Sequence, residues 1–202
     1  MIKLLKNRWA LSTVITTLII LVVSVLLASI LTYFAINVVS TRVQEESLHV
    51  TKAHIWHNAT ATAGTSAYCV ASLMVINTGG RDVVLNTIAV RGQQSPWNDS
   101  TNTNQKFVAY CTTTDPISGD LSYVPDFNYT GGTNYMVVGS TTYNFTVATR
   151  ELILKSGYTM LLYVINPDSI SVNDVGLTVG ITLHTAQAIY YRETNIQAVS
   201  SS

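Results

Sequence analysis

The chain has 202 residues with 11 basic and 11 acidic side chains, so its formal net charge is zero. Charged residues make up 11% of the sequence and hydrophobic residues 48%, whereas soluble globular proteins carry roughly 25% charged residues. The neutral balance argues against a nucleic-acid-binding protein, which would show a basic excess. The hydrophobic content argues against a disordered chain.

The N-terminus carries a short basic segment followed by a long uncharged one. Lys3, Lys6 and Arg8 precede a run of 33 residues without charge, from Trp9 through Thr41. The run is apolar on all sides and contains neither Pro nor Gly, so it predicts one unbroken helix over residues 11–48. At about 1.5 Å per residue this helix would be roughly 57 Å long, nearly twice the roughly 30 Å of a bilayer core. It is therefore longer than a secretory signal or a plain membrane anchor requires.

Residues 49–202 follow a different pattern, with short apolar runs bounded by Gly, Asn, Thr and Ser. This pattern predicts an all-β domain. Asn77-Thr78-Gly79-Gly80 separates two of the runs and supplies residues that suit a tight hairpin. No amphipathic helix separates the strands, so we expect a β-sandwich and, for the whole chain, an α+β class. The eight predicted strands are 50–57, 68–76, 82–90, 105–111, 135–138, 143–148, 159–165 and 175–184, with an extension toward residue 191 as the alternative end of the last.

The sequence contains no motif that indicates catalysis or a cofactor. Phosphate-binding, dinucleotide-binding and nucleophile-elbow motifs are absent from it. His54 and His57 are three residues apart, but on a strand such residues point to opposite faces, and no second motif with metal-ligand spacing accompanies them. We therefore expect no enzyme, no cofactor and no metal site.

Four Asn-x-Ser/Thr sequons are candidate N-glycosylation sites. They are Asn58, Asn98, Asn128 and Asn144. Asn98 and Asn128 fall in predicted loops, and Asn58 lies just beyond a predicted strand. Asn144 falls within a predicted strand, so its use requires that it face solvent.

Residues 9–21, Trp-Ala-Leu-Ser-Thr-Val-Ile-Thr-Thr-Leu-Ile-Ile-Leu, resemble the processing region of archaeal type IV pilins. In that family a prepilin peptidase removes a short basic leader that ends in Ala or Gly. The resemblance implies a leader over residues 1–10 and a cut between Ala10 and Leu11. It also implies an immunoglobulin-like β-sandwich as the head domain.

The same resemblance implies a structural role in a surface filament that mediates adhesion. The helix would wait in the membrane and then pack against identical subunits, and its core positions would include Val14, Leu18, Val22, Leu26 and Leu31. Its other partners would be the prepilin peptidase and the membrane assembly machinery. Two alternatives stay open: an archaellin, which is disfavoured by the lack of a Gly-rich motif after the cut, and an unprocessed, membrane-anchored surface protein.

Cys69 and Cys111 lie in different predicted strands. In an extracellular setting a disulfide between them would stabilise the domain by roughly 3–4 kcal/mol. The alternative is two buried thiols that act as small hydrophobic side chains. The external location that the resemblance implies favours the disulfide.

Overall fold

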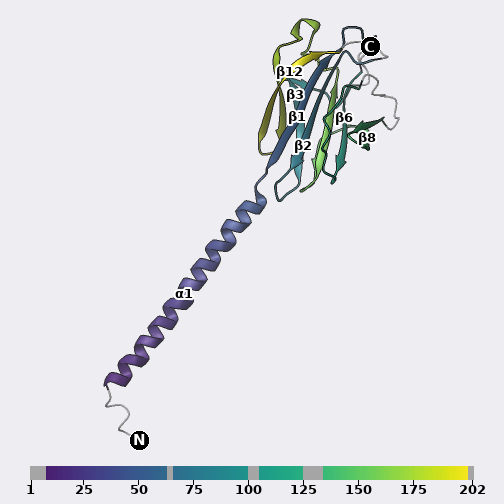
Figure 1. Ribbon diagram of the computed structural model, residues 1–202. Coiled ribbons are helices and arrows are strands. Elements are labelled where there is room, and N and C mark those ends of the chain that lie inside the picture. Colours follow the sequence, from purple (N-terminus) through teal and green to yellow (C-terminus); the bar gives the residue numbers. More distant parts are fainter. Residues whose placement is uncertain (1–7, 63–65, 100–104, 125–133, 200–202) are drawn as a thin grey trace. The chain divides into compact units, whose positions relative to one another are not determined.

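The computed structural model describes residues 8–62, 66–99, 105–124 and 134–199 (Figure 1). The chain divides into two units, Met1–Gln44 and Glu45–Ser202. The first contains one helix and the second, called the β domain below, contains the strands. This arrangement confirms the predicted layout of an N-terminal apolar helix followed by a β-rich domain.

Helix α1 runs without a break from Arg8 to Gln44, a length of 37 residues. The prediction of one continuous helix is therefore confirmed, although the helix ends four residues before the expected position. It ends there because the chain enters the β domain almost at once. Leu48 is already the first residue of strand β1, where it pairs with Asn77 and is buried.

Among the described residues of the β domain, twelve strands join into one sheet. Their bounds are β1 Leu48–His57, β2 Cys69–Asn77, β3 Val83–Val90, β4 Gln93–Ser95, β5 Asn98–Asp99, β6 Lys106–Thr113, β7 Asn134–Val138, β8 Thr141–Val147, β9 Leu152–Leu154, β10 Thr159–Ile165, β11 Thr178–Thr185 and β12 Ile189–Ala198. Each of the eight predicted strands is present, and β10 has the predicted bounds. The last predicted strand, 175–184, corresponds to β11, which ends at Thr185. The extension toward residue 191 belongs to a separate strand, β12, which returns antiparallel to β11.

The main path through the sheet is β4-β3-β11-β12-β1-β2-β10-β6-β8-β7. Neighbours on this path pair antiparallel, except that β1 and β12 are parallel over a short stretch near His57. This β1–β12 contact joins the half of the sheet that contains β3 and β11 to the half that contains β2, β10 and β6.

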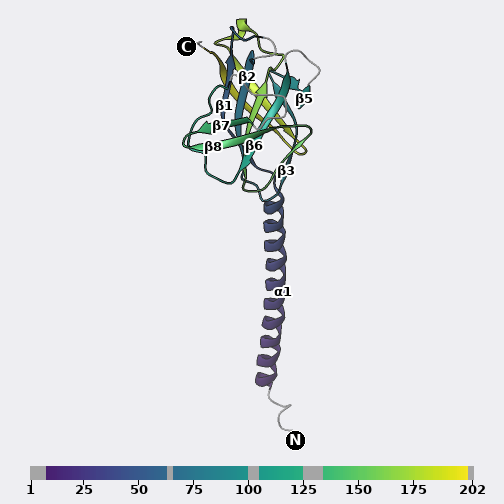
Figure 2. The same ribbon diagram turned by 90° about the vertical axis from the view of Figure 1, so that its right-hand side faces the viewer.

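The two halves pack face to face around a hydrophobic core, called core 1. It consists of the odd-numbered residues of β2, the even-numbered residues of β10 and the inward residues of β3, β9 and β11. The opposite face of β2, β10 and β6 forms a second core, called core 2, with the β7–β8 hairpin and the segment around Leu121. In Figure 2 this hairpin crosses the face of the sheet. Because both faces of β10 are covered, all seven of its residues are buried.

The segment after Asn77 does not form the predicted hairpin, because β2 and β3 do not pair with each other. The chain instead crosses there from one half of the sheet to the other. The buried amide of Asn77 organises the crossing: its nitrogen donates to the carbonyls of Arg81 (2.8 Å) and Leu154 (3.1 Å), and its oxygen accepts from the Gly79 N–H. A side chain at Gly79 would clash with the backbone, since its Cβ would lie 2.9 Å from the carbonyl oxygen of Glu45.

Replacing Leu162 with Ala should destabilise the β domain by about 2–5 kcal/mol, because it opens a cavity in core 1 at a fully buried position. The measurement is urea unfolding of the full chain in detergent micelles, followed by tryptophan fluorescence. Ile153→Ala is the matched control, since that side chain is 61% exposed and its loss should change the unfolding free energy by less than about 0.5 kcal/mol. Equal losses in the two variants would contradict the assignment of core 1.

Candidate functional site

The surface of α1 is the most unusual feature of the chain. Within Ser12–Thr41 an 18-residue window of the helix reaches a mean hydropathy of 2.9, and the side chains from Ser12 to Thr41 are exposed among the residues that the structure describes. It is long and apolar enough to cross a membrane. The five predicted core positions, Val14, Leu18, Val22, Leu26 and Leu31, are each between 46% and 69% exposed. The structure thus places them on an apolar surface that their own chain leaves uncovered.

Six hydroxyl groups on α1 donate hydrogen bonds to carbonyls within the helix. Thr16 donates to the carbonyl of Ser12 (2.8 Å), Ser24 to that of Ile20 (2.6 Å) and Ser29 to that of Val25 (2.8 Å). Thr17, Thr32 and Thr41 make equivalent bonds to the preceding turn. A hydroxyl bonded in this way needs no water, so these residues fit an apolar environment without leaving an unsatisfied polar group.

The predicted cleavage bond, between Ala10 and Leu11, lies in the first turns of α1. The first seven residues of the predicted leader, with Lys3 and Lys6, lie outside the described residues. Removal of residues 1–10 stays a prediction.

The sequons differ in their surroundings. Asn144 is exposed on β8 between two buried residues, so it meets the condition of facing solvent. Asn98 is exposed on β5, and Asn128 lies outside the described residues. The half-buried Asn58 instead uses its amide internally: its nitrogen donates to the Tyr123 hydroxyl (3.2 Å), and its oxygen accepts from the Thr60 N–H and hydroxyl.

The predicted disulfide between Cys69 and Cys111 is wrong, because both cysteines are free. The sheet order explains why. Leu161 of β10 pairs with both Met74 of β2 and Cys111 of β6, so Cys111 lies two strands away from β2 and at the level of Met74. At about 4.8 Å per strand and about 3.3 Å per residue, the two cysteines are too far apart for a bridge, which needs a Cα separation below about 7 Å. They also face different cores.

The two histidines of β1 lie on opposite faces of the sheet, as the strand periodicity predicted. His54 stacks on Trp56 of core 2, with ring centroids 5.3 Å apart, and one ring nitrogen lies 3.0 Å from the Asp120 carboxylate. His57 lies on the face of core 1 and is buried. Burial lowers the pKa of His57, and the negative charge of Asp174 offsets part of this effect.

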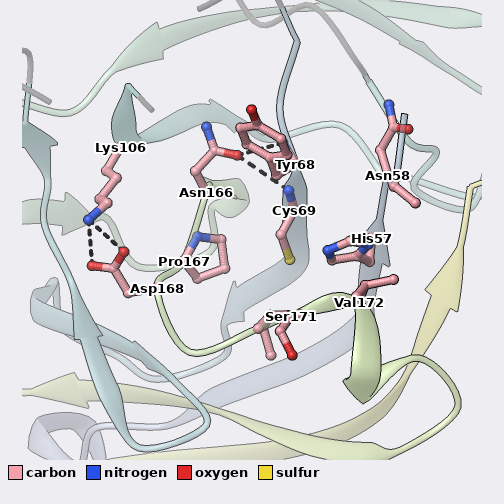
Figure 3. Close-up of a pocket in the computed structure, with 12 residues that line it drawn as sticks. His57, Asn58, Tyr68, Cys69, Lys106, Asn166, Pro167, Asp168, Ser171 and Val172 are labelled. Carbon is pink, nitrogen blue, oxygen red and sulfur yellow. Dashed lines mark hydrogen bonds and ion pairs between the residues drawn. The ribbon is translucent and has the colours of Figure 1, made fainter. Parts of the chain in front are cut away.

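A cavity of about 510 Å³ opens where core 1 ends, beside His57 and Cys69 (Figure 3). It lies at the end of β1, the start of β2 and the start of β6, and the segment after β10 closes one side. Asn166, which has a positive φ of 51°, shapes that segment, and its side-chain oxygen accepts from the backbone N–H groups of Tyr68 (2.8 Å) and Cys69 (3.3 Å). At the rim, Lys106 and Asp168 form an ion pair of 2.5 Å.

Sequence reasoning missed this cavity because its residues come from four separate segments. In the part of the chain that the structure describes, no three His, Cys, Asp or Glu side chains converge in a way that could hold a metal ion. The sequence matches no protein-family model, and no significantly similar sequence was found among curated proteins.

The two free thiols should react at very different rates. Burial raises the pKa of Cys69 to about 12 and also raises that of Cys111, which is only partly buried. A thiol of pKa about 12 is ionised to roughly one part in ten thousand at pH 8, and only the thiolate reacts. We expect two reactive thiols in the chain unfolded in guanidinium without reductant. In the folded chain we expect Cys69 to be alkylated at least about 100-fold more slowly than Cys111, as measured by mass spectrometry of the labelled peptides.

The Cys111→Ser variant isolates Cys69 and serves as the control for this experiment. If the unfolded wild-type chain had no reactive thiols, the two cysteines would be bridged and the predicted disulfide would be correct after all. Equal alkylation rates in the folded chain would contradict the burial of Cys69.

Proposed function

We propose that the chain is a structural subunit of an archaeal type IV pilus-like surface filament that polymerises through α1 and serves adhesion. The observation that carries the proposal is a helix of 37 residues whose apolar side chains from Val14 to Val39 are exposed among the residues that the structure describes. The pilin-like residues 9–21 support it independently.

The length of α1 favours a filament core over a simple anchor. At about 1.5 Å per residue it extends roughly 55 Å, and a lipid core of about 30 Å covers only part of that length. A bundle of identical helices can cover all of it, and each buried Leu, Ile or Val side chain contributes about 1.5–3 kcal/mol. Because hydroxyls such as those of Thr16, Ser24 and Ser29 are already bonded within the helix, they can move from lipid into the bundle without losing these hydrogen bonds.

In this proposal the basic leader holds the N-terminus on the cytoplasmic side of the membrane. Prepilin peptidase cuts between Ala10 and Leu11 and removes charges that a packed helical core would not tolerate. The assembly machinery then adds subunits by a repeated operation that does not close, which produces a helical polymer. The β domain, proposed to be an immunoglobulin-like sandwich, forms the exterior, where the exposed Asn98 and Asn144 are the proposed glycan positions.

A membrane-anchored surface protein is the second candidate. It is favoured by the 30-residue apolar span itself, which meets the length and composition of a membrane helix. This candidate keeps residues 1–10 and does not polymerise, so one measurement separates it from the filament subunit.

That measurement is the N-terminal peptide of protein sheared from intact cells, determined by mass spectrometry. We expect it to begin at Leu11, and we expect Ala10→Trp to prevent cleavage, because a bulky side chain replaces the small residue before the cut. Protein that begins at Met1 and is found only in membranes would support the anchored protein and overturn the filament proposal.

Placing a carboxylate on α1 should block assembly. Val22 lies near the middle of the apolar span and is exposed in the single chain. An unpaired Asp there costs about 2.5–3.5 kcal/mol in an apolar environment. We expect Val22→Asp to abolish filaments in electron micrographs.

Two variants control for side effects of this substitution. Val22→Leu keeps the position apolar and should assemble, and Ile153→Asp places the same charge on an exposed strand of the β domain and should also assemble. The membrane content of the Val22→Asp precursor is measured in parallel, so that failed insertion is distinguished from failed assembly. Normal filaments from inserted Val22→Asp would show that α1 is not the filament core.

A further inference from the structure

His57 and Cys69 are direct neighbours across the β1–β2 pair. They form a non-hydrogen-bonded pair, because the Asn58 N–H donates to the carbonyl of Tyr68 (2.7 Å), while the Cys69 N–H donates to the Asn166 side chain. In such pairs the Cα atoms are only about 4.5 Å apart and both side chains lie on the same face. In Figure 3 the Cys69 side chain and the His57 ring lie beside each other at the edge of the cavity.

The His57 side chain has an unmet hydrogen-bonding need. The residue is only 8% exposed, and within the described part of the chain its Nδ1 is buried without a hydrogen-bond partner. A buried polar atom left unpaired costs about 1–3 kcal/mol, and native proteins keep few of them without a reason such as a bound ion or water. The unpaired nitrogen therefore marks a place where a ligand would stabilise the fold.

The charged groups around the pair are already engaged with one another. Asp174 accepts hydrogen bonds from the N–H and hydroxyl of Ser171, both 2.8 Å, and pairs with Arg91 at 2.7 Å. Lys106 pairs with Asp168 at the rim. Beside these engaged groups lie the Cys69 thiol, a soft donor, and the His57 imidazole, a nitrogen donor that suits copper.

We propose that Cys69 Sγ and His57 Nδ1 together bind one thiophilic monovalent metal ion of the copper(I) and silver(I) class. Such ions accept two ligands, whereas a structural zinc ion needs four and calcium needs six or more oxygens. Binding releases the thiol proton to solvent and forms one metal–sulfur bond and one metal–nitrogen bond, with no change of oxidation state. A monovalent ion thereby replaces a proton and adds no net charge to a buried site, whereas a divalent ion would add one unpaired charge.

The site belongs to the β domain and does not depend on the assembly of α1. The cavity provides the route by which an ion reaches a thiol that is only 2% exposed. Because the thiol proton must leave, the apparent affinity should rise about tenfold for each unit by which the pH increases toward the pKa of Cys69.

The test uses the full chain in detergent, in chloride-free nitrate buffer, with silver(I) as the probe. Cys111→Ser is the background, because it removes the second thiol. We expect this variant to bind one equivalent of silver by native mass spectrometry, and calorimetry to give the affinity. Adding His57→Ala should weaken binding at least about tenfold, whereas adding His54→Ala, on the opposite face, should leave it unchanged. A chain that lacks both cysteines should not bind at this site.

The His57 signal in nitrogen NMR spectra of the Cys111→Ser chain gives a measurement that needs no substitution at the site. One equivalent of silver should shift the Nδ1 resonance and leave those of His54 unchanged. An unchanged affinity in the folded His57→Ala variant, or an Nδ1 resonance that does not move, would overturn the two-ligand site. Failure of the Cys111→Ser chain to take up silver would overturn it as well. None of these results bears on filament assembly, which is tested on intact cells.

Discussion

The chain carries 30 consecutive helical residues, Ser12–Thr41, that have no charge and are exposed in the described part of the structure. Water is a poor solvent for such a surface, so some other phase or partner must shield it. The other properties of the chain are consistent with this constraint. The β domain completes its own cores without α1, so that the helix is left available for lipid or for other helices.

Inside the β domain, β2 and β10 are the structural centre because both of their faces are covered. Their side chains alternate between core 1 and core 2, so Leu162 packs on one side and Tyr163 on the other. Tyr163 brings a hydroxyl into core 2, where it donates to the Ser122 carbonyl at 3.0 Å. Full burial of the ring raises the pKa of this hydroxyl, which keeps it neutral and able to donate.

The parts of the fold that the sequence predicted are those that depend on local pattern. An uncharged run without Pro or Gly can only be one long helix, and continuous apolar runs such as Thr159–Ile165 identify strands buried on both faces. Short strands such as β4, β5 and β9 were missed, because two or three residues carry no periodicity. The hairpin after Asn77 was wrongly predicted because its residues suit a turn, while the strand pairing around it is decided by partners far away in the sequence.

The same limit applies to the candidate sites. The exposure of Val22 on α1 follows from local composition, so the sequence was enough to propose it. The disulfide failed because its geometry depends on β10 lying between β2 and β6, an order that no local pattern reveals. For the same reason the pairing of His57 with Cys69 was not visible: the sequence associated His57 with His54, its neighbour in the chain, while the sheet register associates it with Cys69.

The helix α1 and the β domain differ in how their polar atoms in apolar surroundings are hydrogen-bonded. On α1 the hydroxyls of Ser24 and Ser29 bond to their own helix, so these two side chains can pass from one apolar environment to another without losing a hydrogen bond. In the β domain the Nδ1 of His57 is buried beside the cavity and has no hydrogen-bond partner among the described residues. An atom in that state destabilises the free protein and so gives any ligand that satisfies it a matching advantage. The apolar surface of the helix therefore suits either lipid or other helices, whereas the end of core 1 favours a ligand that pairs with the His57 Nδ1.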